Sequence, residues 1–169
     1  MHKLKPLRIT IILAAILFIF DAFVLNQGFV SLVIILITLF VLLPRALWVY
    51  RKNRQLYLTR LTKAGIYLLA AFSVFTANAL QNRIADRRAI ALGNACLAFH
   101  AKYNHYPQQL NELVPEFIPY VPMAKPLAGA PFSYFSPPSG HEPMLYYQAL
   151  PPFGRRFYHM ERGFWGFMD

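Results

Sequence analysis

Two polar stretches near the C-terminus carry residue types that can perform acid–base chemistry. One is His141-Glu142, in a turn between apolar runs, and the other is His159 with Glu161. An imidazole and a carboxylate in one cleft can move protons to and from a substrate. This set supports one hypothesis, a membrane enzyme or enzyme subunit acting on a lipid or a glycan. Solvated turn residues are the simpler interpretation of the same side chains.

The single cysteine, Cys96, is followed four residues later by His100, so both can lie on one helix face. A zinc site needs further ligands that the neighbouring sequence lacks, and a Cys–His nucleophile needs an orienting acid. We therefore expect Cys96 to be a small buried residue in a packed helix. No catalytic residue, metal ligand or cofactor is assigned, and the chain is not expected to be an enzyme.

The composition favours a membrane protein over a nucleic-acid binder. The chain has 169 residues, of which 57% are hydrophobic, and 17 basic residues against 7 acidic ones give a net charge of +10. Nine of the 17 basic residues lie before residue 64 and flank apolar runs, where they act as topology signals. We therefore expect membrane lipids as partners and no nucleic acid.

Three apolar runs, at residues 9–25, 29–43 and 64–80, are long enough to cross a bilayer once flanking residues extend them. Pro44 closes the second apolar run, and residues 46–50 are expected to extend that membrane segment. The link at residues 26–28 is so short that the first two runs form a hairpin with both outer ends on one side. Lys and Arg gather at those ends, so the N-terminus and the 45–63 loop are expected in the cytoplasm of a bacterium. Residues after 80 then lie in the periplasm, and the protein lies in the inner membrane.

Six residues are candidates for contact with a partner or with lipid. Asp21 is the only ionisable residue well inside an apolar run, a position that often marks function; the simpler interpretation is that it lies one turn from the hairpin tip and reaches interfacial water. Small residues around Gly65 permit close lateral helix packing. A basic collar could meet lipid phosphate or an acidic partner, and it consists of Arg83, Arg87 and Arg88. The last candidate is Trp165, in the apolar tail at 163–168, which is expected to return to the membrane surface or to bind a partner.

The third apolar run is expected to continue as one helix from about residue 64 to about residue 102, roughly 58 Å long. Beyond the membrane it carries an apolar stripe with helical spacing. The residues of this stripe are Ala85, Ala89, Leu92, Cys96, Phe99 and Tyr103. A short helix around 108–114 and apolar runs at 131–135, 144–149 and 155–160 follow, separated by Gly/Pro turns, which predicts an antiparallel meander. We expect this sheet to pack across the apolar stripe of the long helix.

This order of elements resembles the type IV pilins and the pseudopilins of type II secretion, above all the major pseudopilin. The segment Tyr103 to Leu113 resembles the family's "Y…YP…L…L" stretch, and Pro126 to Tyr134 resembles its "DPWGNPYQY" loop. The resemblance covers about residues 64–160. It implies a long N-terminal helix, half in the membrane and half packed against a small sheet, that takes part in an assembly.

The chain also departs from that family. The family has a Glu five residues after its processed glycine, whereas Gly65 is followed at that distance by Ala70. Two membrane helices precede the family-like part. Lys125 stands where the major pseudopilin has an acid, and the acids of its calcium loop are missing, so no calcium site is expected.

The sequence thus predicts a membrane α+β protein with an N-terminal transmembrane helical hairpin, followed by a long pilin-like helix packed by a small antiparallel β-meander. Residues 1–63 would form the hairpin and its basic loop, and residues 64–169 the pilin-like module. Within that module we expect membrane helix at 64–80, the exterior half of the same helix at 81–105 and the sheet head at 106–169. The expected role is a non-enzymatic accessory or assembly protein that binds membrane or periplasmic proteins as a homo- or hetero-oligomer. The systems to which it would belong are a type IV pilus or a type II secretion-like system. A small structural subunit of a complex unrelated to pili stays open as an alternative.

Overall fold

The computed structural model describes residues 5–25, 28–137, 142–150 and 154–168. The chain forms two compact units, unit 1 (Met1–Asn78) and unit 2 (Ala79–Asp169), so the boundary between them falls inside one long helix. That helix, α4 (Arg54–Tyr103), has 50 residues. The domain boundary expected after residue 63, between the hairpin with its basic loop and the pilin-like module, stays a prediction.

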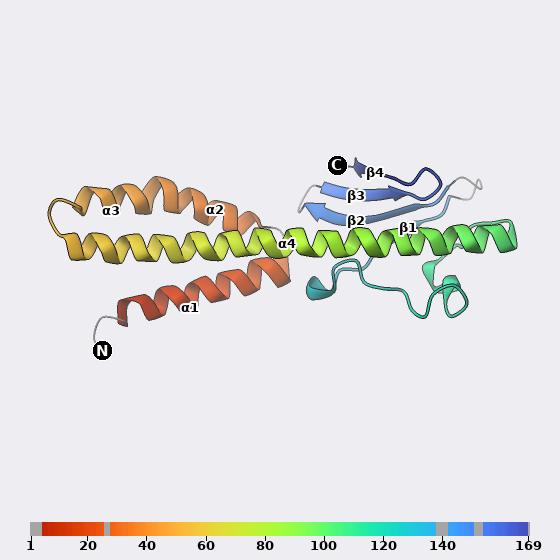
Figure 1. Cartoon of the computed structure of the whole chain (residues 1–169), viewed down its shortest axis with the longest axis horizontal. Helices are drawn as coiled ribbons and strands as arrows, with labels where there is room; N and C mark the ends of the chain where they lie inside the picture. The colour runs from red at the N-terminus through yellow and green to blue at the C-terminus, as the bar shows by residue number, and fades with distance from the viewer. Residues whose placement is uncertain (1–4, 26–27, 138–141, 151–153, 169) are drawn as a thin grey trace. The chain divides into compact units, whose positions relative to one another are not determined.

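Unit 1 contains the two N-terminal helices of membrane length and the first part of α4. Its elements are α1 (Lys5–Ile19), the π-helical segment η2 (Phe20–Leu25), α2 (Phe29–Ile37), the π-helical segment η3 (Thr38–Leu42), α3 (Leu43–Val49) and the first part of α4. Among the residues that the structure describes, three helices are long and apolar enough to cross a membrane: Leu7–Leu25, Phe29–Val49 and Arg54–Tyr103. Large apolar side chains such as Ile12, Phe40 and Phe72 point outward. Such a surface suits hydrocarbon and not water. Figure 1 shows the hairpin helices beside the N-terminal half of α4.

The expected extension of the second apolar run beyond Pro44 is confirmed, because the second membrane-length helix is Phe29–Val49. The helical chain runs from η3 directly into α3, with Pro44 among the first residues of α3. A proline inside an α-helix lacks an N–H and its ring clashes with the carbonyl four residues earlier. A π-helical turn widens the backbone just before the proline, so the chain accommodates it without stopping.

The loop expected at 45–63 is shorter than predicted. Helix α3 continues to Val49, a turn follows, and α4 begins at Arg54, ten residues before the expected start. Asn53 caps the new start, because its side-chain oxygen accepts the Leu56 N–H at 2.9 Å. The basic residues of this stretch are therefore mostly on helices.

Unit 2 contains a four-stranded antiparallel sheet in the order β1-β2-β3-β4. Its strands are β1 (Ser133–Phe135), β2 (Met144–Leu150), β3 (Gly154–His159) and β4 (Phe164–Met168). The first three match the predicted runs. The apolar tail was expected to return to the membrane surface or to bind a partner. In the structure it forms β4, which pairs with β3.

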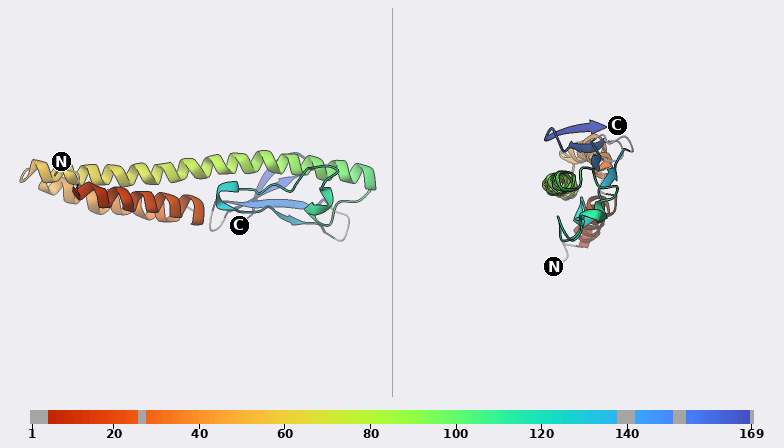
Figure 2. Two further views of the ribbon diagram at one scale, coloured as in Figure 1. Left: turned by 90° about the horizontal axis from the view of Figure 1, so that it is seen from below. Right: turned by 90° about the vertical axis from the view of Figure 1, so that its right-hand side faces the viewer.

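The core of unit 2 lies between the sheet and the C-terminal half of α4, with the segment 104–132 running beside the same half (Figures 1 and 2). The predicted stripe is buried except at its end, where Tyr103 is 42% exposed. Strand β2 alternates as a half-buried strand should, with Leu145, Tyr147 and Ala149 facing the helix. The 3₁₀ helix η4 (Leu110–Leu113) adds Leu110 and Leu113 to this core. The predicted fold class is confirmed.

Candidate functional site

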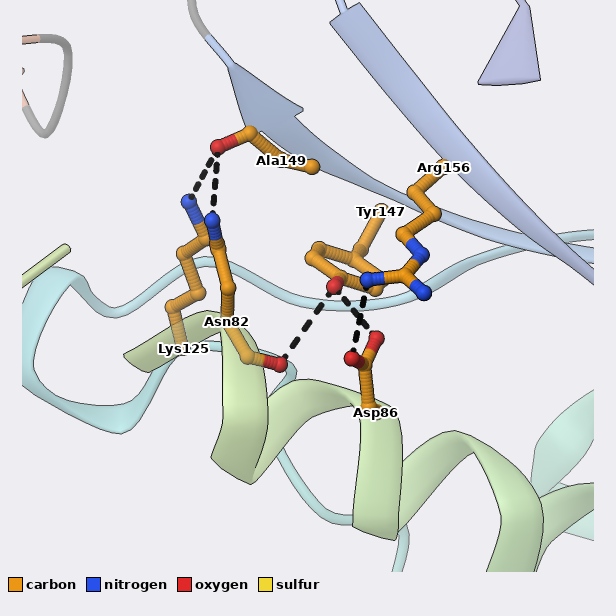
Figure 3. Close-up of polar contacts among 6 residues, drawn as sticks. All are labelled: Asn82, Asp86, Lys125, Tyr147, Ala149 and Arg156. Carbon is orange, nitrogen blue, oxygen red and sulfur yellow. Dashed lines mark hydrogen bonds and ion pairs between the residues drawn. The ribbon is translucent and has the colours of Figure 1, made fainter. Parts of the chain in front are cut away.

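A polar cluster joins the sheet to α4 within unit 2 (Figure 3). Its centre is Asp86, whose two carboxylate oxygens accept a hydrogen bond from the Tyr147 hydroxyl at 2.6 Å and one from Arg156 Nη1 at 2.9 Å. Burial and the hydrogen bond to Asp86 raise the pKa of Tyr147, so the phenol keeps its proton and serves as a donor. Helix α4 thus contributes one carboxylate that binds two neighbouring strands.

Arg156 extends this cluster to the outermost strand. Its guanidinium lies over the Trp165 ring, 4.6 Å from the ring centroid. Trp165 is also tilted against Tyr158, with the centroids 4.9 Å apart. A cation between a carboxylate and an indole face is held from both sides. Trp165, proposed as a partner or lipid residue, is therefore half-buried and in contact with the head's own core.

Lys125 is the largest fully buried side chain among the described residues and is only 1% exposed. Its Nζ donates to the Ala149 carbonyl at 3.4 Å, and Asn82 Nδ2 donates to the same oxygen at 3.1 Å. Burial lowers the pKa of Lys125 to about 8. Within the described residues, Asn82 Oδ1 and Arg156 Nε are buried without a hydrogen-bond partner. The cluster is therefore polar, partly unsatisfied and suited to holding elements together.

The structure brings three of the four predicted acid–base residues together, while His141 lies outside the described residues. His159 Nδ1 is 3.5 Å from a carboxylate oxygen of Glu142. The other oxygen of Glu142 accepts the Glu161 backbone N–H at 2.8 Å, and the Glu161 carboxylate accepts the Tyr106 hydroxyl at 2.5 Å. Burial, with Glu161, raises the pKa of Tyr106. These residues form a second polar group, here called the Glu142 cluster.

Asp21 does not reach interfacial water, and that interpretation is wrong. Its side chain is fully buried, and its carboxylate accepts the backbone N–H groups of Gly28 at 3.1 Å and Ser31 at 2.8 Å, together with the Ser31 hydroxyl. Gly28 is the residue before α2, so Asp21 satisfies amides that the helix start leaves free. A carboxylate at a helix N-terminus is also favoured by the helix dipole.

The remaining candidate residues lie on the surface of their units. Gly65 is exposed, and a β-carbon there would meet no atom within 4 Å apart from the adjoining backbone of its own helix. Arg83 and Arg87 are exposed one turn apart on α4, while Arg88 Nη1 donates to the Met123 carbonyl at 2.7 Å. Their proposed contacts with partners stay predictions.

Cys96 and His100 do not meet in a metal site. Cys96 is fully buried in the core of unit 2. His100 is stacked instead on Tyr106, with the centroids 4.3 Å apart. Across the described ranges, His, Cys, Asp and Glu form no group of three that could hold a metal ion.

Comparison with family models, with curated proteins and with solved structures finds no match for this chain. Any function of the sites described above must therefore be inferred from their own geometry. The class that the structure defines is coarse: two N-terminal apolar helices of membrane length, then a long helix packed against a four-stranded antiparallel sheet.

Proposed function

We propose that this chain is a non-enzymatic accessory or assembly protein of a bacterial inner membrane, with a pilin-like head in the periplasm. The observation that carries the proposal is α4. Its N-terminal half is membrane-grade apolar sequence, and its C-terminal half supports a sheet through the buried stripe. A helix shared by a membrane anchor and a small antiparallel sheet is the arrangement that the resemblance to pilins and pseudopilins implies. That kinship, and a link to a pilus or secretion system, are part of the proposal.

The distribution of Lys and Arg supports one orientation of the chain in the membrane. Basic residues gather at the outer ends of the hairpin, and the positive-inside bias puts those ends in the cytoplasm. Residues after Leu80 then face the periplasm. On that side, Arg83 and Arg87 are exposed on α4 close to the membrane-grade half of the helix. An acidic partner is the chemistry that such a pair selects.

Crosslinking in native membranes tests the partner role. A photoreactive residue at position 90, exposed one turn from Arg87, should capture a specific membrane or periplasmic protein, and the double change Arg83→Glu/Arg87→Glu should abolish copurification of that protein. The matched control is Arg155→Glu/Arg162→Glu, which reverses two exposed head cations elsewhere. Equal loss in both variants, or in neither, would count against the proposed surface. A captured complex without pilus or secretion components would favour the alternative of an unrelated structural subunit.

A second candidate function, a membrane enzyme or enzyme subunit acting on lipid or glycan, is favoured by the Glu142 cluster. There His159 and Glu142 lie within 3.5 Å of each other, and Glu161 adds a second carboxyl group. An imidazole beside a carboxylate is a common acid–base arrangement. Complementation of a deletion strain by Glu142→Gln and His159→Ala tests it. Full complementation by both variants would remove this candidate, and loss with normal protein levels would support it.

A further inference from the structure

Two adjoining hollows lie within unit 1, where α1, the η3–α3 region and the start of α4 meet. The first has a volume of about 560 Å³ and is lined in part by Arg45, Arg60 and Lys63. The second has a volume of about 570 Å³ and an almost wholly apolar lining. Leu13 and Tyr67 line both hollows, so the two form one groove that is cationic at one end and apolar at the other.

The cationic end has no acidic partner within its unit. Arg60 Nη1 donates to the Arg45 backbone carbonyl at 2.8 Å, which holds the guanidinium beside the hollow. The only acidic residue among residues 1–78 is Asp21. Its carboxylate is already bonded to Gly28 and Ser31. Three like charges lining one hollow repel each other, so this end of the groove favours an anion.

The length of the groove matches one bilayer leaflet. Its wall along α1 and the start of η2 extends from Ile9 at the cationic end to Phe20 at the apolar end. At the rise of an α-helix these positions are roughly 16 Å apart. Half of the hydrocarbon core of a bilayer is about 15 Å. A ligand with a charged head and a hydrocarbon tail of leaflet length therefore fits the groove in both charge and size.

One buried polar atom in the apolar part also lacks a partner. Thr38 is fully buried and lines the second hollow, and its hydroxyl has no hydrogen-bond partner among the described residues. A buried hydroxyl without a partner is costly. Because this oxygen is fully buried, a lipid ester would reach it only after a change in the Thr38 rotamer.

We propose that this groove binds one anionic phospholipid of the leaflet on the basic side. The phosphate lies among Arg45, Arg60 and Lys63, where charge-assisted hydrogen bonds are strongest. One hydrocarbon chain lies along the apolar hollow past Leu13 and Phe20. This inference goes beyond the proposed accessory role and depends only on the membrane placement of unit 1.

Native mass spectrometry of the full chain released from nanodiscs tests the proposal. In nanodiscs with equal phosphatidylglycerol and phosphatidylcholine, the wild-type chain should retain one phosphatidylglycerol in preference to phosphatidylcholine. The variant Arg60→Gln/Lys63→Gln should lose about tenfold or more of that preference. The matched control, Arg51→Gln/Lys52→Gln, removes one Arg and one Lys that are exposed and do not line the groove, and it should keep the preference.

A second pair of variants tests the hydrocarbon end. Leu13→Trp places a large side chain where the hollows meet and should expel the lipid although all cations remain. Ile12→Trp, on the exposed neighbouring face of α1, should not. If the variant Arg60→Gln/Lys63→Gln does not fold, the two tryptophan variants and the wild-type measurement still test lipid binding in the groove.

Three results would overturn the proposal. The first is equal retention of the two lipids by the wild-type chain. The second is equal loss in the groove variants and their controls, which would indicate general surface charge. The third is displacement of the lipid by glycerol 3-phosphate at comparable concentration, which would show a site for free phosphate compounds instead of a lipid.

Discussion

The Tyr158 ring lies directly over Gly93 of α4, with its Cε1 2.8 Å from the position that a β-carbon on residue 93 would occupy. Real β-carbons do not approach other atoms so closely. Glycine in a helix interior costs about 1 kcal/mol relative to alanine. The close approach of β3 to the helix gives this glycine its physical reason.

Gly93→Ala should destabilise the head despite the gain in helix propensity. Overpacking a filled interface costs about 1–3 kcal/mol, which exceeds or cancels the propensity gain. Thermal unfolding of the detergent-solubilised chain, followed by Trp165 fluorescence in a Trp48→Phe background, measures the change. Gly93→Ala/Tyr158→Leu, which removes the clashing ring, should recover much of the loss relative to Tyr158→Leu alone. An increase in stability in the single Gly93→Ala variant would mean that the sheet is not docked at this distance.

Asp86→Asn should destabilise unit 2 by about 2 kcal/mol, because Arg156 would lose its charged partner in a half-buried site. The control is Glu116→Gln, which breaks the exposed ion pair with Lys102. Exposed pairs contribute little, so this variant should unfold at nearly the wild-type temperature. Equal effects of the two substitutions would remove Asp86 from its role of holding the sheet to the helix.

Lys125→Met should change the pH dependence of stability. Burial lowers the folded-state pKa of Lys125 from its usual 10.5 to about 8. Below pH 8 both the folded and unfolded chains carry the charge, and the folded chain bears the full cost of burying it. As the pH rises from 8 to 10.5 the folded chain loses its proton first, so the wild-type protein gains stability, by roughly 3 kcal/mol at most.

The methionine variant should lack this gain and should be more stable than wild type near pH 7. The Ala149 carbonyl keeps its hydrogen bond from Asn82, so the substitution leaves no buried acceptor unpaired. The measurement is denaturant unfolding of both proteins from pH 7 to 10.5, compared as a difference because tyrosines also titrate. A constant difference across this range would contradict the burial of a charged lysine.

The fold was predictable where the chain repeats a simple pattern. Ala85, Ala89 and Leu92 follow helical spacing, and the runs that became β1 to β3 are separated by Gly/Pro turns. Strand β4 could not be predicted from alternation, because its exposed and half-buried residues do not alternate. The π-helical turn before Pro44 could not be predicted, because composition does not specify it.

The polar sites were much less predictable. Asp86 and Arg156 are 70 residues apart in the sequence, and only the docking of β3 on α4 brings them together. The buried role of Asp21 depends on Ser31, ten residues later in the sequence, lying beside its carboxylate. A signal for it was present, since an acid inside an apolar run must have a partner.

Asp21→Ala should destabilise the helical hairpin of unit 1 by about 2 kcal/mol or more. The substitution leaves the Gly28 and Ser31 amides without the acceptor that they have in the buried tip. Ser31→Ala, which removes only the hydroxyl and keeps the amide, should have a smaller effect. The resistance of the purified chain to unfolding in mixed SDS micelles measures both, and an Asp21→Ala variant as stable as wild type would show that water replaces the carboxylate.

Cysteine accessibility in bacterial spheroplasts decides whether the head and the basic ends of the hairpin lie on opposite sides of the inner membrane. In a Cys96→Ala background, single cysteines replace Gln55 at the start of α4 and Asn111 in the head, both exposed. A membrane-impermeant maleimide should label Asn111→Cys in intact spheroplasts and Gln55→Cys only after lysis. Labelling of both positions before lysis, or the reverse order, would contradict the proposed membrane placement.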